Sequence, residues 1–187
     1  GFHPEWGDER LTVVASMAGA ICILPESFYT ADKPTLFLYG DGDVIAPYAG
    51  NGSGPYAKAK APKTLITLKG GTHIGFAGSA ATLFATIPNP DSIGCTALLG
   101  NIGEQSLEGL LTELGFDEQE TDAAQCPSPC ETTTPDDQVM PPLRQVELVN
   151  AALGIYLRAQ LFGDEALKGF IATELGKQDD VTVESAP

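Results

Sequence analysis

The sequence predicts an α/β protein in which parallel strands are flanked by helices. Two short apolar runs, Thr35–Tyr39 and Thr64–Leu68, each end at glycines. Unbroken runs of this kind are typical of strands that are buried on both faces. Farther along, Leu143–Phe162 repeats apolar residues at helical spacing after a pair of prolines. This pattern predicts a long helix with one apolar face.

The composition predicts a single globular domain over residues 1–187. Apolar residues make up 43% of the chain, which is enough for a core. The net charge is −15, with 25 acidic and 10 basic residues, and this excess of acids argues against nucleic acid or an anionic membrane as a partner. The longest apolar stretch, Leu11–Leu24, is too short to span a membrane and is interrupted by Gly19. We therefore expect no membrane span.

The first part of the chain predicts one more strand and two connections. Leu11–Ile23 has the apolar composition of a strand, and Pro25–Ala31 is expected to be the loop that follows it. After the second strand, Ala46–Gly54 carries three glycines and is expected to be a loop, since glycine disfavours a helix interior. Pro55–Ala61 then predicts a short helix that leads into the next strand.

The region beyond the second apolar run is less regular. Ala77–Ile87 is rich in alanine and predicts a helix, and Leu98–Leu114 repeats leucine and isoleucine near helical spacing. Phe116–Met140 is acidic and rich in proline, which predicts an excursion over the surface. We expect residues 88–142 as a whole to form a surface excursion stapled by a disulfide. Val181–Pro187 is an acidic tail for which the sequence indicates no role.

The chain contains four cysteines, Cys22, Cys95, Cys126 and Cys130. A proline-rich loop has little core of its own, so the expected staple joins Cys95 to Cys126 or to Cys130. Cys22 lies in an apolar run and is expected to be a buried free thiol. A disulfide would indicate an oxidising compartment and a secreted or otherwise exported protein. Zinc is disfavoured because the chain has two histidines, and we expect neither a metal nor a cofactor.

Acidic and basic side chains follow the two apolar runs at the point where each one ends. Asp41 and Asp43 come after the first run, and His73 comes after the second. Functional groups of parallel sheets gather beyond the carboxyl ends of the strands. A carboxylate there can fix the tautomer of an imidazole and stabilise its protonated form. We expect Asp43 to be the partner of His73, because Asp41 directly follows Gly40 and is better placed to cap the turn or face water.

These two segments resemble the last two strands of an α/β-hydrolase. The pattern P-x-L-x-L-x-G-x-x-D-x-I-x-P runs from Pro34 to Pro47, and G-G-T-H ends at His73. The resemblance is to the esterase and lipase branch that includes dienelactone-hydrolase-like and platelet-activating-factor-acetylhydrolase-like enzymes. It extends over residues 10–76 and implies that Asp43 is the triad acid and His73 the general base. It also implies that the chain is the C-terminal half of the fold, with the first half absent.

The nucleophile of that family is not found in this chain. The expected strand-to-helix elbow is G-x-S-x-G, and no serine here has glycine at both positions. Ser16, in the segment SMAGAI, comes nearest. However, Val14 is too bulky for the tight turn, and too few residues separate Ser16 from Lys33 for a helix and another strand. Since the chain begins at Gly1 without methionine, we expect an upstream segment or a separate chain to carry the serine.

The resemblance implies a hydrolase of carboxylic esters that uses a Ser-His-Asp triad. Its partners would be the ester substrate and the companion segment that completes the fold. A second interpretation is a binding or structural protein that retains the fold without turnover, because the missing elbow and the acidic surface fit that reading as well. The same acid and histidine also serve cysteine or aspartate nucleophiles in related enzymes.

Overall fold

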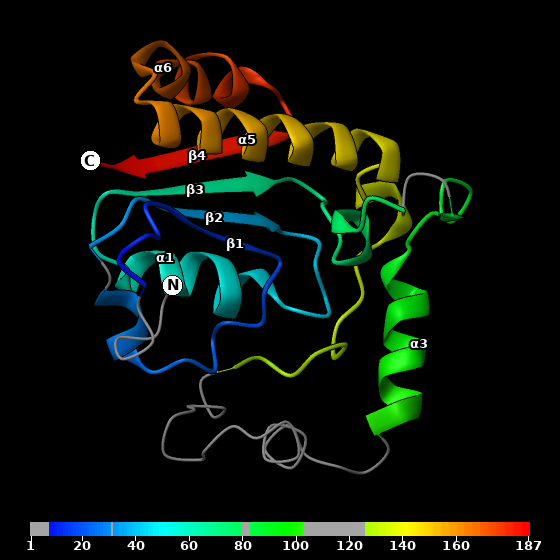
Figure 1. Cartoon of the computed structure of the whole chain (residues 1–187). Helices are drawn as coiled ribbons and strands as arrows, with labels where there is room; N and C mark the ends of the chain where they lie inside the picture. The colour runs from blue at the N-terminus through cyan, green and yellow to red at the C-terminus, as the bar shows by residue number, and fades with distance from the viewer. Residues whose placement is uncertain (1–7, 31, 80–82, 103–125) are drawn as a thin grey trace.

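A computed structural model of the chain describes residues 8–30, 32–79, 83–102 and 126–187. The described residues form one sheet whose strands lie in chain order: β1 (Val14–Met17), β2 (Thr35–Gly40), β3 (Lys63–Leu68) and β4 (Val181–Ala186). The first three strands are parallel, and β4 runs antiparallel to β3. Figure 1 shows this sheet between two layers of helices. The predicted α/β class is confirmed, although the sheet is mixed and not purely parallel.

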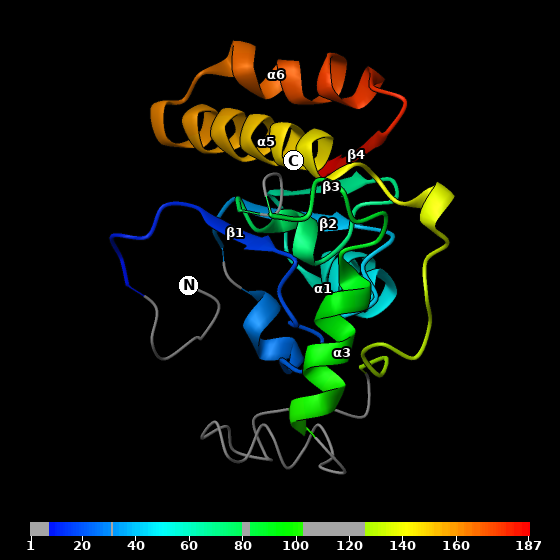
Figure 2. The same ribbon diagram turned by 90° about the vertical axis from the view of Figure 1, so that its right-hand side faces the viewer.

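Helices cover both faces of the sheet. On one face lie α5 (Pro142–Phe162) and α6 (Glu165–Thr173), and on the other lies α1 (Gly54–Lys58), as Figure 2 shows. A further helix, α3 (Asp91–Ile102), stands at the end toward which β2 and β3 point (Figure 1). Single turns of 3₁₀ helix lie at Glu26–Thr30, Ile74–Phe76, Asp136–Gln138 and Leu175–Lys177.

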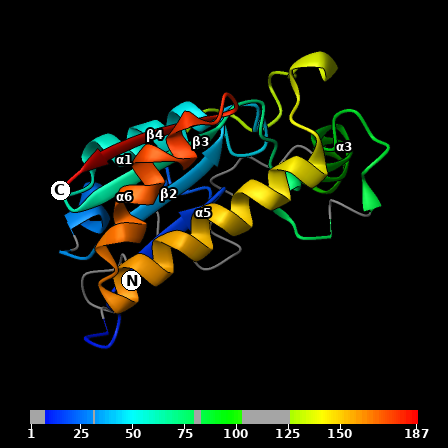
Figure 3. The same cartoon turned by 90° about the horizontal axis from the view of Figure 1, so that it is seen from above.

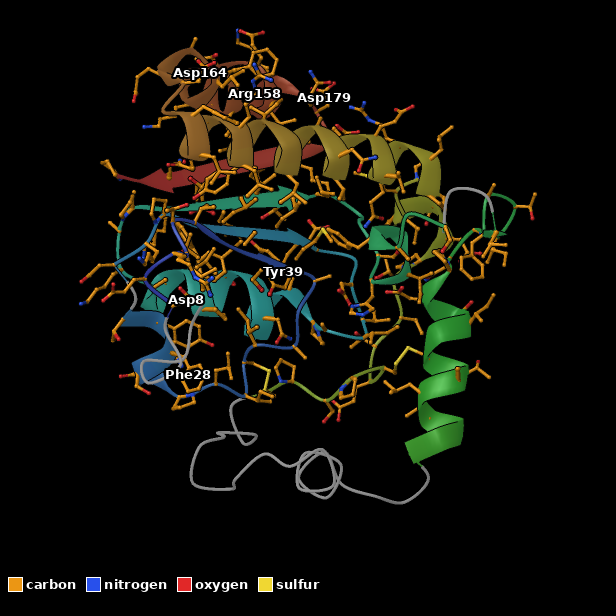
Figure 4. The ribbon with its side chains drawn as sticks, viewed as in Figure 1. Asp8, Phe28, Tyr39, Arg158, Asp164 and Asp179 are labelled. Carbon is orange, nitrogen blue, oxygen red and sulfur yellow. A yellow bond between two sulfur atoms is a disulfide. The ribbon has the colours of Figure 1, made fainter. Side chains whose placement is uncertain are left out.

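The core is built on β2, all six residues of which are buried. Leu36 and Leu38 point toward α5 and pack in one cluster with Tyr156. Phe37 and Tyr39 point the other way, and Tyr39 lies between the sheet and α1 (Figure 4). Alternate side chains of this strand therefore enter two separate apolar layers, as the unbroken apolar run predicted.

The long C-terminal helix is confirmed almost to the residue. α5 begins with Pro142, whose fixed φ suits the first helical turn. It ends at Gly163, which adopts the left-handed conformation with φ 65°. The next residue, Asp164, begins α6 by accepting a hydrogen bond from the backbone N–H of Leu167 at 3.2 Å. The two helices therefore turn back on each other, and α6 lies beside α5 (Figure 3).

The expected loop over Ala46–Gly54 is wrong, because Ala49–Ser53 forms a π-helical turn that continues into α1. The glycines there allow close packing. A Cβ atom on Gly52 would lie 2.7 Å from the Tyr48 ring. Within the turn, buried Asn51 accepts a hydrogen bond from the Cys22 backbone N–H at 3.0 Å. Tertiary contacts therefore outweigh the low helix propensity of glycine at this position.

The C-terminal tail also differs from the expectation, since Val181–Ala186 is strand β4 and pairs with all of β3. Val181 is buried against Leu68, while Thr182 and Glu184 are exposed. Just before the strand, the Arg144 guanidinium on α5 makes an ion pair with Asp180 at 2.8 Å. The tail therefore forms the edge strand of the sheet beside β3.

Several other helices and strands have bounds that differ from those predicted. The strand expected over Leu11–Ile23 is limited to β1, and Pro25–Ala31 contains a 3₁₀ turn. Of the helix expected over Ala77–Ile87, residues 80–82 lie outside the described residues. Leu83 is helical, and its backbone N–H donates to the Ser79 carbonyl at 2.9 Å, while the other described residues there form bends, turns or irregular chain. The helix expected over Leu98–Leu114 begins earlier, as α3, and its part beyond residue 102 lies outside the described residues. So does the first part of the excursion at Phe116–Met140.

Two disulfides link the described cysteines. Cys95 pairs with Cys130, which is one of the two expected pairings. Cys22 pairs with Cys126, so the prediction that Cys22 is a free thiol is wrong. The bonds tie the segment around residues 126–130 both to α3 and to the loop after β1 (Figure 4). Disulfides of this kind are typical of proteins made for an oxidising compartment.

No helix among the described residues is both long and apolar enough to cross a membrane.

Candidate active site

The structure brings the two predicted site residues together at the carboxyl ends of β2 and β3. Asp43 lies in the turn after β2, and His73 lies in the turn after β3, directly before a short 3₁₀ helix. The Nδ1 atom of His73 is 2.9 Å from Oδ2 of Asp43. Because β2 and β3 are parallel neighbours in register, their following loops emerge side by side. The contact is therefore a direct result of the sheet order.

The Asp43 carboxylate is held in one orientation. Its side chain is fully buried, and Oδ1 accepts hydrogen bonds from the backbone N–H groups of Ile45 at 2.9 Å and Ala46 at 2.7 Å. These bonds are the local reason for an aspartate in the turn, since its short side chain reaches the backbone two and three residues ahead. With Oδ1 engaged, Oδ2 is directed at His73.

The His73 imidazole is partly exposed. Its side chain is 32% exposed, and no hydrogen bond to Nε2 is found among the described residues. With Nδ1 on the carboxylate, Nε2 is the nitrogen that can exchange a proton with a bound molecule. Burial lowers the pKa of His73, but the hydrogen bond to Asp43 and the charges of Asp43 and Asp91 outweigh it, so the pKa lies above its ordinary value.

Asp41 has a different task. Its Oδ1 accepts a hydrogen bond from the backbone N–H of Gly70 at 2.5 Å. The carboxylate therefore ties the turn after β2 to the turn after β3 without contacting His73. The two acids of this loop accordingly have separate roles, in keeping with the preference for Asp43.

Gln145 of α5 supports the histidine loop from the side of the core. This fully buried side chain accepts a hydrogen bond from the Thr72 backbone N–H at 3.0 Å and donates one to the Thr72 carbonyl at 2.8 Å. Gly75 makes room for it, since a Cβ atom there would lie 2.0 Å from the Gln145 amide oxygen. The sequence analysis did not identify this residue. Its signal was a polar side chain within the apolar stripe of the helix.

Asp91 is a second residue that sequence reasoning missed. It is fully buried at the start of α3 and accepts backbone hydrogen bonds from His73 at 2.9 Å and Ile74 at 2.8 Å. Burial raises the pKa of the Asp91 carboxyl above its ordinary value, although these hydrogen bonds oppose the shift. An Asn-Pro-Asp segment before a helix was its signal in the sequence, but that signal indicates a helix start and not a partner.

Ser16 does not contact His73. Its hydroxyl is buried on β1 and lies 2.6 Å from the Tyr39 hydroxyl, which in turn donates to the Gly19 carbonyl at 2.9 Å. Within the described ranges, no serine hydroxyl forms a hydrogen bond with His73. The described residues therefore pair a carboxylate with an imidazole and place no serine hydroxyl on that imidazole.

A metal site is not found in the part of the chain that the structure describes, since no three His, Cys, Asp or Glu side chains there are placed to hold an ion.

The chain matches no protein-family model, no curated protein and no solved structure.

Proposed function

We propose that the chain is the C-terminal part of an exported α/β-hydrolase that cleaves carboxylic esters. The observation that supports this most is the bond of 2.9 Å between His73 Nδ1 and buried Asp43 Oδ2, made by an imidazole that stays partly exposed. An acid and a histidine at the carboxyl ends of adjacent parallel strands form the base half of a Ser-His-Asp triad.

In this proposal, Nε2 of His73 removes the proton of a serine hydroxyl as its oxygen attacks the ester carbonyl carbon. The imidazolium then donates that proton to the departing alcohol, which leaves an acyl-serine. A water molecule then attacks the acyl-serine while His73 again takes the proton. The imidazolium returns that proton to the serine oxygen, and the carboxylic acid is released. Asp43 holds the imidazole in the productive tautomer and stabilises its charged form.

The serine would come from a companion segment that pairs with β1. In the described residues, β1 pairs with β2 alone, which leaves its other edge open. Ala15 and Met17 of β1 stand beside Leu36 and Leu38 in the parallel register, yet Met17 is 40% exposed while the two leucines are fully buried under α5. An open edge with uncovered apolar side chains favours the addition of another strand.

A second candidate function is a binding or structural protein without turnover. It is favoured by one specific observation, the lack of any described serine hydroxyl on His73. The two candidates differ in whether the imidazole activates a nucleophile.

A fluorophosphonate probe tests the proposal, because it reacts with serines that a histidine activates. The probe is applied to the protein together with the companion segment that the proposal requires, and labelled polypeptides are identified by mass spectrometry. We expect label on a serine of the companion segment, and we expect His73→Ala to abolish it. Asp41→Asn serves as the matched control and should retain the label. Absence of label from this complete protein would contradict the proposal and favour the binding role.

A further inference from the structure

Asp91 connects the two loops that carry Asp43 and His73. Its Oδ2 accepts hydrogen bonds from the backbone N–H groups of His73 at 2.9 Å and Val44 at 3.4 Å, and its Oδ1 accepts one from Ile74 at 2.8 Å. One carboxylate thus contacts the residue after the acid, the histidine itself and the residue after the histidine. Asp41 also links the two turns, through Gly70, but Asp91 bonds to the backbone of His73 itself.

This arrangement differs from ordinary helix capping. A capping carboxylate accepts N–H groups of the first turn of its own helix. In α3, however, the first N–H groups bond to backbone carbonyls: Ser92 to Asn89, and Ile93 and Gly94 to Pro90. The Asp91 oxygens are therefore directed away from their own helix and toward the site.

We propose that Asp91 is a positioning residue that fixes the separation of Asp43 and His73, and that α3 is the element that carries it. The inference rests on the proposed function, since it assigns Asp91 a part in the work of that acid and base. Asp91 does not touch the substrate in this proposal. It acts through the backbone of the two loops.

Hydrogen bonds and a disulfide that hold α3 against the acid loop support this role. The Asn89 side chain accepts a hydrogen bond from the Asp91 backbone N–H at 3.1 Å and donates one to the Thr134 carbonyl at 2.8 Å. The Thr134 hydroxyl in turn donates to the Gly42 carbonyl at 2.9 Å, next to Asp43. The Cys95–Cys130 disulfide joins α3 to the same excursion, so the helix is tied to the acid loop from several directions.

Close packing adds to these bonds. A Cβ atom on Gly94 of α3 would lie 2.6 Å from Ile45 Cδ1 and 3.2 Å from Ile74. Glycine at this position lets the helix rest against one residue from each loop. Because a catalytic pair displaced by about 1 Å can lose about 100-fold in rate, a rigid support of this kind has a clear benefit for general base catalysis.

The substitution Asp91→Asn tests the proposal, because it preserves the shape of the side chain and replaces one accepting oxygen with an NH₂ group. The readout is the NMR titration of His73 and the exchange of its Nδ1 proton, with His3, the chain's other histidine, as an internal reference. Loss of the Asp91 charge by itself lowers the pKa of His73, so the exchange of the Nδ1 proton is the readout that reports positioning. We expect His73 to titrate at lower pH in the variant and its Nδ1 proton to exchange faster. Exposed Asp136 provides the control, Asp136→Asn, which should change neither.

Unchanged titration and proton exchange in folded Asp91→Asn would overturn the proposal and leave Asp91 with a role in stability alone. Should this variant fail to fold, Asn89→Ala loosens Asp91 indirectly and should shift both readouts in the same direction, and no shift would count against the proposal. With the companion segment and an ester present, Asp91→Asn should lower kcat about 10–100-fold at a nearly unchanged KM. If the wild type hydrolyses no ester, the proposed function fails. The NMR result still decides whether Asp91 is a positioning residue.

Discussion

Gly40, the last residue of β2, lies in backbone contact with Gly71, in the turn after β3. A Cβ atom on Gly40 would lie 2.0 Å from the Gly71 carbonyl oxygen, so no larger residue fits without moving the chain. This contact brings the two strand ends close enough for the Asp43 carboxylate to reach His73. The close approach of two residues without side chains is therefore one condition for the contact between the acid and the base.

We predict that Gly40→Ala destabilises the fold by about 1–3 kcal/mol, because the added methyl group forces the two turns apart. Gly154→Ala is the control. Apart from the adjoining residues and backbone of its own helix, no described heavy atom lies within 4 Å of a Cβ atom at Gly154, and alanine in that helix interior should stabilise the protein by about 1 kcal/mol. Urea denaturation measures both. Equal effects of the two substitutions would contradict the packing argument.

Gln145→Leu should also destabilise the protein, since it removes the partners of both backbone groups of Thr72. An orphaned buried polar group costs about 1–3 kcal/mol. Glu147→Gln is an exposed change on the same helix and should stay within about 0.5 kcal/mol of the wild type. Chemical denaturation at one pH compares them. A Gln145→Leu variant as stable as Glu147→Gln would show that the Thr72 bonds add nothing.

The disulfide pairing can be checked directly. Proteolysis without reduction, followed by mass spectrometry, should recover linked peptides for Cys22–Cys126 and Cys95–Cys130. Replacing both Cys95 and Cys130 by serine should lower the unfolding free energy by about 2–4 kcal/mol. Recovery of a Cys95–Cys126 peptide, the alternative that the sequence left open, would refute this pairing.

The sequence was most informative where neighbouring residues set the structure. The strands before Asp43 and His73 could be predicted because apolar runs that end at glycine are local patterns. The long helix α5 could be predicted because its periodicity and its prolines lie in the same segment. The sequence therefore indicated where the two loops emerge, and the sheet order then brought their side chains together.

The missed features depend on contacts between distant parts of the chain. Cys22 and Cys126 are 104 residues apart, and the partner of a cysteine cannot be read from spacing alone. Gln145 and Asp91 resemble ordinary polar positions until the loops of Thr72 and His73 fold against them. The strand β4 was missed because alternate exposed acids and polar residues hide the buried face of Val181.

The contribution of His73 to stability should depend on pH in a defined direction. Its pKa in the fold is raised above the ordinary 6.5, so its charged form is favoured by folding. The stabilisation is then fully present below pH 6.5 and is lost as the pH rises through the folded pKa. Denaturation of the wild type and of His73→Asn over this range should show a difference that shrinks with rising pH. A difference that grows would contradict this assignment.

The account depends on the pairing of Asp43 with His73, and ¹⁵N NMR titration of the imidazole tests it most directly. In the wild type we expect the neutral ring to carry its proton on Nδ1 and to titrate above 6.5. In Asp43→Asn we expect the titration to move to lower pH, while Asp41→Asn leaves it in place. A His73 that titrates identically in the wild type and in Asp43→Asn would contradict the central claim.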